Sequence, residues 1–529
     1  MARVASFALQ GIEGYPVQVE VDVSGGLPGL TIVGLPDAAV SEARERVRTA
    51  VRNSGLEYPS RRITVNLAPA DVRKEGPAFD LPIALGLLAA TGQVPDEPLQ
   101  RLVVAGELAL DGSVRPVKGV LSLALSLKEQ LQQAGEPLEL LVPAGNAGEA
   151  RQVPGLVTHA AGDLASVVAW VRGGGVLSDA LGEQAAGAAN DAGIRSTERL
   201  EHQRLEHVDL SDVRGHVAAK RALEVAAAGG HNALLVGPPG SGKTMLARRL
   251  PTLLPPLSLE ESLETSRIYS VAGLLDGRRG LLRERPFRAP HHGLSASALV
   301  GGGAHPRPGE ISLAHHGVLF LDEMPEFHRD ALEALRQPLE EARVTVVRGG
   351  LSVTYPAQTM VVAAMNPCPC GWLGDEEHRC TCRPAAVERY RGRVSGPLLD
   401  RFDLHLHIPR QSRPATADSG QEGAGDREES SAVVRRRVTA ARHRQAERLA
   451  PFGLRTNGEM PPRLMRKVCR LTPAAERLME AAMSRLHLTW RGHDRVLRLA
   501  QTIADLEGSV RIEAHHAAEA VQYRSWEQG

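Results

Sequence analysis

The sequence predicts a mixed α/β protein with a parallel sheet at its centre, a separate α+β domain before that sheet and an all-helical domain after it. Three observations predict this fold class. Short apolar runs of strand length recur between residues 233 and 408, and stretches with helical spacing separate them. An earlier set of such runs occupies residues 1–170, and from residue 432 onward the spacing is helical.

The chain is long for one domain, because 529 residues at about 150 residues per domain correspond to three or four domains. Hydrophobic residues make up 43% of it, which is enough for packed cores, and aromatic residues only 3%. Lys plus Arg and Asp plus Glu number 62 each, so the formal net charge is zero. This balance excludes a strongly basic protein, and a surface that attracts nucleic acid has to be local.

The cysteine pattern and the lack of long apolar segments predict a cytoplasmic protein. Four of the five cysteines lie between Cys368 and Cys382, unlike the disulfide framework of a secreted domain. The first residues contain no apolar core of a signal peptide. No run approaches the ~18 uninterrupted apolar residues that a membrane span requires.

Composition predicts the divisions of the chain. Gly, Ala, Asp and Glu dominate one break, and Pro, Gly, Ser, Asp and Glu dominate a second. The predicted parts are a first domain (1–170), a flexible linker (171–206), a core with a Cys-rich loop at 368–382 (207–410), a disordered loop (411–431) and a helical domain (432–529).

Residues 1–170 are expected to alternate strands and helices. Valines at every second position from Val17 to Val23 predict a strand with one buried face. The other expected strands are Ile63 to Leu67, Leu102 to Val104 and Leu138 to Val142, and the clearest expected helices are Val40 to Ser54 and Asp80 to Thr91.

Two motifs of this first domain resemble the proteolytic domain of Lon-type proteases, which has a ribosomal S5 domain 2-like fold. Lys74-Glu-Gly-Pro-Ala78 is similar to the Lys-Asp-Gly-Pro-Ser motif of that family, and Gly106 to Pro116 is similar to its Gly-Glu…Gly-x-Val-x-Pro strand pair. Ala78 stands where that family has its nucleophilic serine, and its catalytic lysine falls at about Leu121. Because a Ser/Lys dyad needs a hydroxyl and an amine in contact, we expect a scaffold without proteolytic activity.

A glycine-rich pattern follows the apolar run Ala233 to Val236 and matches G-x-x-x-x-G-K-[ST]. Glycines let backbone N–H groups turn toward phosphates, and the following helix adds a partial positive charge. Lys243 is expected to reach the β- and γ-phosphates of a nucleotide, and the Thr244 hydroxyl to contact Mg²⁺. An ordinary glycine turn is the alternative, but the strand-loop-helix context favours nucleotide binding. The predicted binding residues are Gly237, Pro238, Pro239, Gly240, Ser241, Gly242, Lys243 and Thr244.

Polar residues end two further apolar strands. Asp322 and Glu323 follow the run that starts at Gly317, and Asn366 follows Met360 to Met365. Asp322 is expected to hold Mg²⁺ through water, and Glu323 to polarise the water that attacks the γ-phosphate. Asn366 would orient the same water, although Asn-Pro is also a common turn. Surface carboxylates after a buried strand are the alternative, but their place ~80 residues after the phosphate loop favours ATP hydrolysis.

Several segments of the core resemble the AAA+ ATPases related to the magnesium-chelatase I subunit. They are Gly237 to Thr244, Leu319 to Glu323, Ala363 to Gly371 and Leu398 to Asp403. Pro286 to His292 and Pro308 to Gly317 are similar to the ComM/YifB subgroup, competence-associated proteins with a Lon-like N-terminal domain. The resemblance covers nearly the whole chain and leaves out mainly the linker and the loop at 412–431.

The resemblance implies an ATP- and Mg²⁺-dependent ring motor, by family precedent a hexamer, that acts on single-stranded and branched DNA. It implies a helicase that drives branch migration in natural transformation or homologous recombination. Arg401 falls at the arginine finger of the family, and Arg491 at its second sensor, with Arg495 and Arg498 on the same helix. An ion pair of Arg401 with Asp400 or Asp403 is the alternative. A chelatase-type motor that remodels a partner protein is the rival function, and Ala78 and Leu121 oppose a protease.

Two insertions are candidates for DNA contact. Glu341 to Tyr355 is predicted to form a β-hairpin around Gly349-Gly350, and Leu299 to Pro308 is a glycine-rich excursion. In the related family such hairpins point into the ring channel, and solvated hairpin tips are the alternative. The candidate contacts are Arg343, Arg348, His305 and Arg307.

A helix with many arginines is expected from Ala432 to Leu449, usually a sign of a solvated face, with DNA contact as the alternative. Its arginines are Arg435, Arg436, Arg437, Arg442, Arg444 and Arg448. Farther along, Thr472 and Pro473 are expected to start another helix, as N-cap and first residue.

Cys368, Cys370, Cys380 and Cys382 form two C-x-C pairs. Four thiolates suit a tetrahedral, structural Zn²⁺, with four reduced cysteines as the alternative. His378 is a candidate to replace one ligand. Cys469 is expected to be a packed core thiol.

Overall fold

The computed structural model describes residues 1–134, 138–175, 177, 208–276, 280–303, 306–348, 351–411, 428–486 and 488–524. The chain divides into two compact units. The first unit consists of Met1–Arg195, Leu259–Leu282 and Val353–Tyr355, and the second of Ser196–Ser258, Arg283–Ser352 and Pro356–Gly529. Residues 178–206 of the predicted linker and 412–427 of the predicted loop lie outside the described residues.

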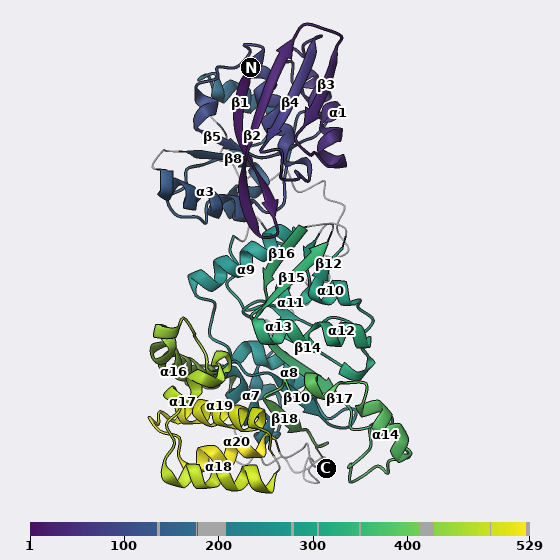
Figure 1. Cartoon of the computed structure of the whole chain (residues 1–529), viewed down its shortest axis with the longest axis vertical. Helices are drawn as coiled ribbons and strands as arrows, with labels where there is room; N and C mark the ends of the chain where they lie inside the picture. The colour runs from purple at the N-terminus through teal and green to yellow at the C-terminus, as the bar shows by residue number, and fades with distance from the viewer. Residues whose placement is uncertain are drawn as a thin grey trace, which may run out of the picture. The chain divides into compact units, whose positions relative to one another are not determined.

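The first unit is built on a seven-stranded mixed sheet with the order β3-β4-β2-β1-β5-β8-β9 (Figure 1). Its strands are β1 (Ala2–Gln10), β2 (Glu13–Ser24), β3 (Gly29–Val33), β4 (Arg62–Ala68), β5 (Leu102–Val104), β8 (Glu139–Pro143) and β9 (Thr158–Ala161). The pairs β1–β2 and β2–β4 are antiparallel and the others are parallel. Its longer helices are α1 (Ala38–Asn53), α2 (Asp80–Ala90), α3 (Val120–Ala134) and α5 (Leu164–Val171).

Hydrophobic cores lie on both faces of this sheet. Leu102 and Val104 belong to the core that includes α1 and α2, whereas Val103 belongs to the core that includes α3. Successive side chains of a strand point to opposite faces, so the two cores lie on opposite sides. The predicted burial of every second side chain in β2 is confirmed, because Val17, Val19 and Val21 are all buried. These residues fix the register of the strand.

Helix α9 (Leu259–Ala272) belongs to the first unit, although it follows the phosphate loop in sequence. It packs against α3. The Ser270 hydroxyl donates to Glu149 Oε2 at 2.7 Å and accepts the Leu121 N–H at 3.3 Å. Burial raises the pKa of the Glu149 carboxyl, and the hydrogen bond from Ser270 counteracts this rise. Leu121 is itself fully buried, so a hydrophobic side chain occupies the position at which a Lon-type lysine is expected.

The second unit contains a five-stranded sheet with the order β11-β14-β17-β10-β18. All four neighbouring pairs are parallel. The strands are β11 (Phe287–Arg288), β14 (Val318–Leu321), β17 (Met360–Met365), β10 (Ala233–Val236) and β18 (Leu404–His407). Every residue of β10, β14 and β17 is buried, which explains their uninterrupted apolar sequences. The predicted mixed α/β fold with a parallel sheet is confirmed.

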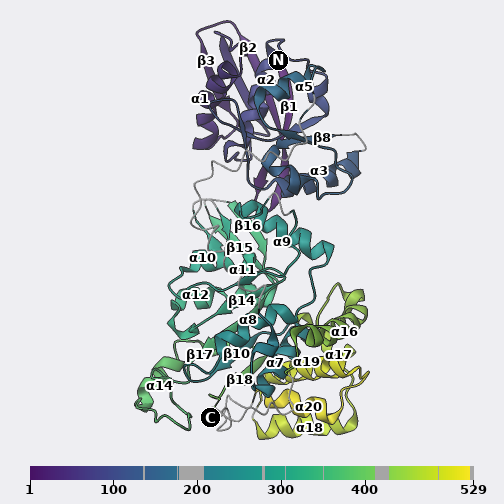
Figure 2. The same ribbon diagram turned by 180° about the vertical axis from the view of Figure 1, so that it is seen from behind.

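Helices surround this sheet and continue into a helical group near the C-terminus, which is plain from both sides (Figures 1 and 2). The helices around the sheet are α7 (Val217–Gly229), α8 (Lys243–Leu253), α10 (Ala296–Val300), α11 (Glu310–Leu313), α12 (Arg329–Ala334), α13 (Arg336–Glu341), α14 (Pro384–Arg391) and α15 (Gly396–Leu399). The helical group comprises α16 (Ser431–Leu449), α17 (Pro462–Val468), α18 (Pro473–Arg485), α19 (Trp490–Glu507) and α20 (Ala514–Gln522). We call α16–α20 the lid.

One hydrophobic core runs from the sheet into the lid. It contains Leu235 of β10, Val225 of α7, Val438 of α16 and Ile503 of α19. Helices α16 and α19 both pack on α7, so α7 joins the lid to the sheet. The predicted start of α18 is confirmed, since Thr472 accepts a hydrogen bond from the Ala475 N–H and Pro473 is the first helical residue. Among the described residues, no helix is both long and apolar enough to cross a membrane.

Candidate nucleotide-binding site

The phosphate loop connects the end of β10 to the start of α8, as its sequence pattern predicts. Gly237 cannot be replaced without displacement, because a Cβ there would lie 2.2 Å from the Ile408 carbonyl oxygen. Gly240 and Gly242 have φ angles of 74° and 86°, in the left-handed region that glycine adopts without strain. Helix α8 begins at Lys243. The loop therefore presents a helix N-terminus at the carboxyl end of a central strand, an arrangement that binds phosphate.

Lys243 is directed into this loop. Its Nζ donates to the carbonyl oxygens of Gly237 at 2.7 Å and Pro238 at 2.9 Å, and to Asn366 Oδ1 at 3.2 Å. Burial lowers the pKa of the Lys243 ammonium to about 8, while the charges of Asp322 and Glu323 oppose this change. A partly buried cation held by carbonyl oxygens is ready to exchange them for phosphate oxygens, which carry more charge.

Thr244 and Asp322 are in contact near the carboxyl ends of strands β10 and β14. Thr244 Oγ1 donates to Asp322 Oδ2 at 2.8 Å, although the two residues are 78 positions apart. Asp322 Oδ1 also accepts the Glu323 N–H at 3.0 Å. Hydroxyl and carboxylate oxygens are ligands that Mg²⁺ prefers, so this pair fits a magnesium ion.

Glu323 follows Asp322 in a left-handed backbone conformation, with φ 51° and ψ 45°. For a residue with a side chain this conformation costs about 1–3 kcal/mol and is concentrated at functional sites. Its side chain is 60% exposed. The Glu323 carboxylate is therefore accessible to solvent directly after Asp322.

His292 is a site residue for which the sequence analysis assigned no role. Its Nδ1 lies 3.6 Å from Glu323 Oε2, and its ring lies 4.1 Å from that of His291. The only signal in the sequence was the His-His pair in the family-like segment Pro286 to His292. His292 can hold the Glu323 carboxylate in one orientation.

Asn366 lies at the end of β17 and contacts Lys243, so the structure brings the third strand-end residue to the phosphate loop. The chain then turns at Gly371, where a Cβ would lie 2.5 Å from Cδ of Pro239. The Cys-rich loop is therefore packed directly against the phosphate loop. Burial raises the pKa of the Tyr390 hydroxyl to about 12, and the Asn366 backbone counteracts this rise.

Among the described residues, Arg401 forms no bond with the phosphate loop or with Asp322, Glu323 and Asn366. It forms an ion pair with Glu340 and donates from Nη1 to the Pro397 carbonyl at 2.9 Å. The alternative ion pair with Asp400 or Asp403 was wrong, because the structure pairs those acids with Arg495 at 3.4 Å and Arg498 at 3.7 Å. Arg495 and Arg498 of α19 thus occupy the two acids that were the expected partners of Arg401.

The surroundings of Arg401 are electropositive. Burial lowers the pKa of its guanidinium and the charge of Glu340 counteracts this, while the positive charges of Arg491, Arg336 and Arg495 lower it further. Its Nε is buried and has no hydrogen-bond partner among the described residues. The structure thus brings the predicted finger, Arg401, and the predicted sensor, Arg491, into one positive cluster.

The candidate DNA contacts are only partly described. Helix α13 leads into a two-stranded sheet of β15 (Arg343–Arg348) and β16 (Leu351–Pro356), which agrees with the predicted hairpin. Arg343 is 63% exposed and lies 3.3 Å from Glu341. Arg307 is exposed at the end of a second short sheet of β12 (Gly301–Gly302) and β13 (Arg307–Pro308). His305 and the side chain of Arg348 lie outside the described residues.

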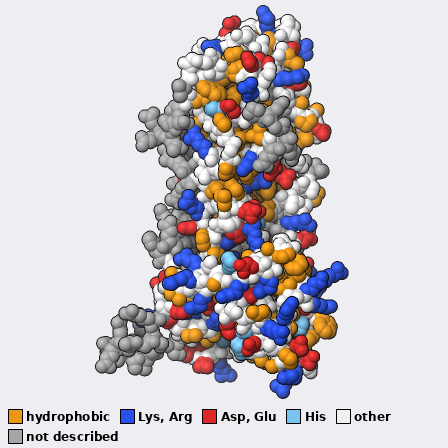
Figure 3. Space-filling model, turned by 90° about the vertical axis from the view of Figure 1, so that its left-hand side faces the viewer, with side chains coloured by type: hydrophobic (Ala, Val, Ile, Leu, Met, Phe, Trp, Pro, Cys, Tyr) orange, Lys and Arg blue, Asp and Glu red, His pale blue; other side chains and the backbone are white. Residues whose placement is uncertain are grey.

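Four of the six arginines of helix α16 form ion pairs or hydrogen bonds with other helices of the second unit. Arg437 pairs with Glu224 and Glu429, and Arg448 pairs with Asp505 at 2.6 Å. Arg442 and Arg444 donate to the carbonyl oxygens of Ala227 and Asp505. The face that contains the lid accordingly shows Lys and Arg interspersed with Asp and Glu (Figure 3). Arg437 and Arg442 therefore join the lid to α7, whereas Arg444 and Arg448 connect two helices of the lid. Arg435 and Arg436 are exposed.

The four cysteines of the Cys-rich loop converge. Cys368 Sγ lies 3.4 Å from Cys370 Sγ and 3.7 Å from Cys380 Sγ, and Cys370 Sγ lies 3.6 Å from Cys380 Sγ. The Cys370 N–H donates to Cys382 Sγ at 3.4 Å. All four sulfur atoms lie within 4.8 Å of one another. His378 instead bonds Asp375 and stacks on Trp372, so the arrangement favours four thiolates over a mixed set.

Cys469 lies elsewhere and is buried among lid residues. Burial raises the pKa of its thiol to about 12. The prediction that it is a packed core thiol is confirmed.

Comparison with known families gives matches along most of the chain. The family described as "Magnesium chelatase, subunit ChlI" matches residues 209–416, which contain the site described above. "Subunit ChlI of Mg-chelatase" matches residues 19–146, and "Magnesium chelatase, subunit ChlI C-terminal" matches residues 428–524. With the parallel sheet and phosphate loop, these matches define a magnesium-chelatase-like protein.

Several curated relatives are similar over nearly their whole length. YifB of Salmonella typhimurium is 44% identical over 525 residues, 99% of this chain and 97% of the relative. The competence protein ComM of Haemophilus influenzae is 42% identical over 527 residues, with 99% and 97% covered. Rv2897c of Mycobacterium tuberculosis is 43% identical over 525 residues, with 99% and 98% covered. The chain belongs to the ComM/YifB family of magnesium-chelatase-like proteins.

Proposed function

We propose that the protein is a Mg²⁺-dependent AAA+ ATPase. The observation that supports this most strongly is the convergence of Lys243, Thr244, Asp322, Glu323 and Asn366, which come from three different strand ends, at one edge of a parallel sheet. Phosphate-binding, metal-binding and water-activating groups are all present there. A binding protein would not need the carboxylate of Glu323 in its strained conformation.

Each residue has a defined role in this proposal. Lys243 and the loop N–H groups bind the β- and γ-phosphates, and Asn366 holds the lysine in place and orients the attacking water. Thr244 and Asp322 hold Mg²⁺, which neutralises charge on the phosphate oxygens when it is bound. Glu323 accepts the proton of the attacking water, and His292 fixes the carboxylate.

The test separates nucleotide binding from turnover. We expect Lys243→Ala to lose ATP binding, and Glu323→Gln to keep ATP binding while turnover falls by about 10²-fold or more. The control is Lys467→Ala, which removes an exposed lysine from the lid of the same unit. ATPase activity of Glu323→Gln equal to that of the wild type would overturn the proposed site.

Arg401 and Arg491 are proposed to act on a nucleotide held by a neighbouring subunit. Among the described residues, Arg401 contacts Glu340 and the Pro397 carbonyl, and no bond joins Arg401 or Arg491 to Lys243, Thr244 or Asp322. Because Arg401 and Arg491 do not contact the phosphate loop of their own subunit, they are available to a nucleotide bound by the phosphate loop of a neighbouring subunit. This arrangement implies a ring of identical subunits, and family precedent gives a hexamer.

We propose that the ring moves on single-stranded and branched DNA in the cytoplasm, as a helicase that drives branch migration. The name of the relative ComM, a competence protein, supports a role in natural transformation, and ordinary homologous recombination would use the same activity. The exposed hairpin residues Arg343 and Arg307 are the proposed contacts, with Arg348 and His305 as further candidates. The test is branch migration of a synthetic Holliday junction by the wild type and by Glu323→Gln. Equal rates would contradict a motion driven by ATP.

A chelatase-type motor that remodels a partner protein is the second candidate. A similarity to the magnesium-chelatase 67 kDa subunit of Heliobacterium mobile, 26% identical over 225 residues, favours it. That similarity covers only 37% of this chain. Stimulation of the ATPase by forked DNA that weakens with added salt would support the DNA motor, because phosphate contacts release counterions. Stimulation by a metal-inserting protein partner alone would support the chelatase-type motor.

We propose that the four cysteines hold a structural Zn²⁺. With Zn–S distances of about 2.3 Å, a tetrahedral site places its sulfur atoms about 3.8 Å apart. The three separations of 3.4, 3.6 and 3.7 Å are already close to this value. All four ligand positions would be protein thiolates, so the ion would brace the loop that follows Asn366 and take no part in hydrolysis.

Metal analysis of the purified protein tests this site. We expect one zinc per chain in the wild type, and a loss of zinc with a lower melting temperature in Cys370→Ser. Cys469→Ser is the matched control, since it removes a thiol from the lid and should keep the zinc. A wild type without zinc, whose melting temperature does not respond to a chelator, would contradict the proposal.

The first unit is proposed to be a Lon-like scaffold without protease activity. Ala78 has no hydroxyl, and the Leu121 side chain is buried in the core under α9. Neither group of a Ser/Lys dyad is present. Casein degradation by the purified protein that disappears in Lys243→Ala would contradict this proposal.

A further inference from the structure

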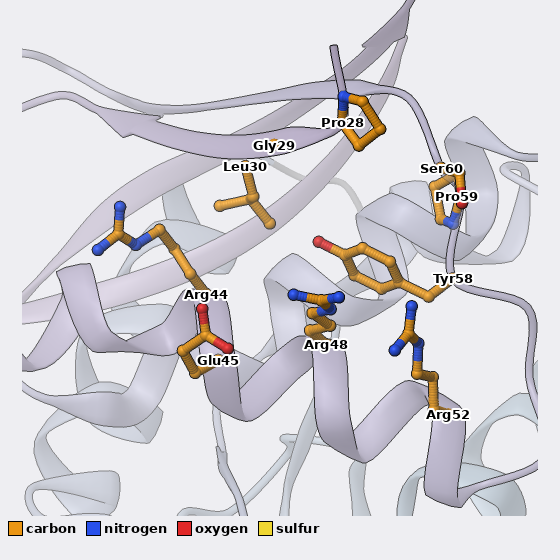
Figure 4. Close-up of a pocket in the computed structure, with 10 residues that line it drawn as sticks. All are labelled: Pro28, Gly29, Leu30, Arg44, Glu45, Arg48, Arg52, Tyr58, Pro59 and Ser60. Carbon is orange, nitrogen blue, oxygen red and sulfur yellow. The ribbon is translucent and has the colours of Figure 1, made fainter.

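The first unit carries a groove that has no part in the proposed ATPase site. It lies between α1 and β3 and has a volume of about 390 Å³. Arg44, Arg48 and Arg52 rise from α1 in one row, and Tyr58 lies on the other wall beside Pro59 (Figure 4). The groove is open to solvent, because all three arginines are exposed.

The arginines form a regular row of cations. Positions separated by four residues lie on one face of a helix, about 6 Å apart along its axis. Among the described residues no carboxylate forms an ion pair with Arg44, Arg48 or Arg52, and the Nε of Arg44 bonds only the Ser41 carbonyl. Arg46 of the same helix, by contrast, pairs with the buried Asp80 at 2.6 Å. The row is therefore free to bind anions.

The opposite wall is largely apolar and aromatic. Tyr58 is half-buried, and the guanidinium of Arg52 lies 5.8 Å from its ring centroid. Leu30 and Pro28 continue this wall along β3. β3 is the edge strand of the seven-stranded sheet, so no described strand pairs with the outer side of its backbone. Glu45 is the one acid of the lining, and it sits beside Arg44 and Arg48.

A ligand for this groove needs regularly spaced negative charges on one side and flat apolar groups on the other. Single-stranded nucleic acid has both, since its phosphates repeat along the backbone and its bases stack on aromatic side chains. An acidic peptide offers the charges without the bases, and free phosphate would leave the Tyr58 wall unused. The groove thus fits a strand more closely than either alternative.

We propose that this groove binds single-stranded DNA, with Arg44 and Arg48 on successive phosphates and a base against Tyr58. The proposal rests on the proposed function, because it assigns a second strand contact to a DNA motor. Arg52 supports the Tyr58 ring and adds to the positive potential. The first unit then holds a strand as well as serving as a scaffold.

The test measures the binding of fluorescein-labelled dT30 to the full-length protein by anisotropy over a range of salt concentrations. We expect Arg44→Ala/Arg48→Ala to weaken binding about tenfold or more, and to lower the salt slope by about 1.4, because each lost phosphate contact in a single strand removes about 0.7. The control is Arg3→Ala/Arg101→Ala, which removes the same charge from exposed positions of the same unit. It should change affinity less than twofold.

Two further measurements address the base contact and the folding of the variants. Tyr58→Ala should weaken binding and leave the salt slope unchanged, and ultraviolet crosslinking of iododeoxyuridine-labelled DNA to wild-type protein should yield a peptide that contains Tyr58. The ATPase rate without DNA should be equal in the wild type and the double arginine variant, which shows that the variant is folded.

The outcomes separate this proposal from the proposed function. If wild-type protein binds dT30 and the double arginine variant binds it equally well, the groove proposal is overturned and the DNA motor stands. If wild-type protein does not bind dT30, the DNA function and the groove proposal both fail. Displacement of dT30 by polyglutamate at equal charge concentration would overturn the groove proposal in favour of an acidic protein partner.

Discussion

Two loops that contain glycine, 74–78 in the first unit and 237–244 in the second, each lead into a helical segment and each contain a lysine. Lys243 lies among the polar side chains of three strand ends. Lys74 is fully buried and donates to the Pro69 carbonyl, and the nearby Ala78 offers no reactive group. The comparison teaches that a glycine-containing loop with a lysine does not by itself make a reactive site, because the neighbouring side chains have to supply the other groups.

Burial alone does not distinguish the two lysines. It lowers the pKa of Lys243, with Asp322 and Glu323 acting in the opposite direction, and it also lowers the pKa of Lys74, with Asp71 acting in the opposite direction. The difference lies in the neighbours. Lys243 has carboxylates and an amide from other strands within reach, whereas the side chain of Lys74 bonds the backbone carbonyl of Pro69, five residues earlier in the chain. The predictions below test this contrast.

The largest effect is expected from Arg401→Ala. If Arg401 completes the site of a neighbouring subunit, its loss should slow ATP turnover by about 10³-fold or more, as for arginine fingers in other nucleotide hydrolases. ATP affinity should change little, since Lys243 remains. Steady-state turnover measured across protein concentrations checks this prediction. Equal specific activity of dilute monomer and concentrated wild-type protein would contradict the completion of the site by a second subunit.

A smaller effect is expected from His292→Ala. The contact between His292 Nδ1 and Glu323 Oε2 is 3.6 Å long and partly exposed. Such a pair contributes about 0.2–1 kcal/mol, which corresponds to a fall in turnover of up to about fivefold. KM for ATP should stay the same, because His292 contacts Glu323 and not the phosphate loop. His291→Ala is the control, as the Nδ1 of that exposed ring bonds only the Gly293 backbone. A rise in KM without a change in kcat would show that His292 contacts nucleotide instead.

The pH dependence of ATP binding should show the state of Lys243. Its ammonium, with a pKa of about 8, is protonated below that pH and binds phosphate, and it loses its proton as the pH rises through 8. The dissociation constant for ATP should therefore rise about fivefold between pH 8 and pH 9. Titration with a fluorescent ATP analogue measures this. Lys243→Arg, which stays charged, should remove the dependence if the lysine causes it.

No gain of proteolytic activity is expected from Ala78→Ser/Leu121→Lys. This result would sharpen the contrast between the two loops. Leu121 is buried, and a lysine there would have to place its amine in an apolar core. We expect no casein hydrolysis and a lower melting temperature. Ala78→Ser alone, at a half-buried position, should change stability much less. Proteolysis by the double variant would show that the scaffold still aligns a dyad.

Local sequence patterns predicted the elements that local forces determine. The strands at 233–236 and 360–365 were predictable because strands buried on both faces are uniformly apolar. The start of α18 was predictable because Thr472, the residue before the helix, can accept a hydrogen bond from the Ala475 N–H three residues ahead. The phosphate loop was predictable because few residue types satisfy its backbone.

Features that depend on tertiary assembly could not be predicted in the same way. The partner of Arg401 is Glu340, 61 residues away on another helix, and no local pattern connects them. The proximity of His292 to Glu323 depends on the adjacent strands β11 and β14, which the sequence did not align. For the same reason, helical spacing identified α16 but not which of its arginines would bond Asp505 of α19.

The first unit is assembled from three separate stretches of chain, with α9 inserted between two parts of the second. A single cut in the gene therefore cannot divide the protein into its two halves. A fragment that starts at residue 207 would keep α9 and lose the Glu149 carboxylate and the α3 surface against which it is buried. The residues that α9 buries, among them Ile268 and Tyr269, would become exposed, and dissection of this protein calls for replacing residues 259–282 with a short polar connector.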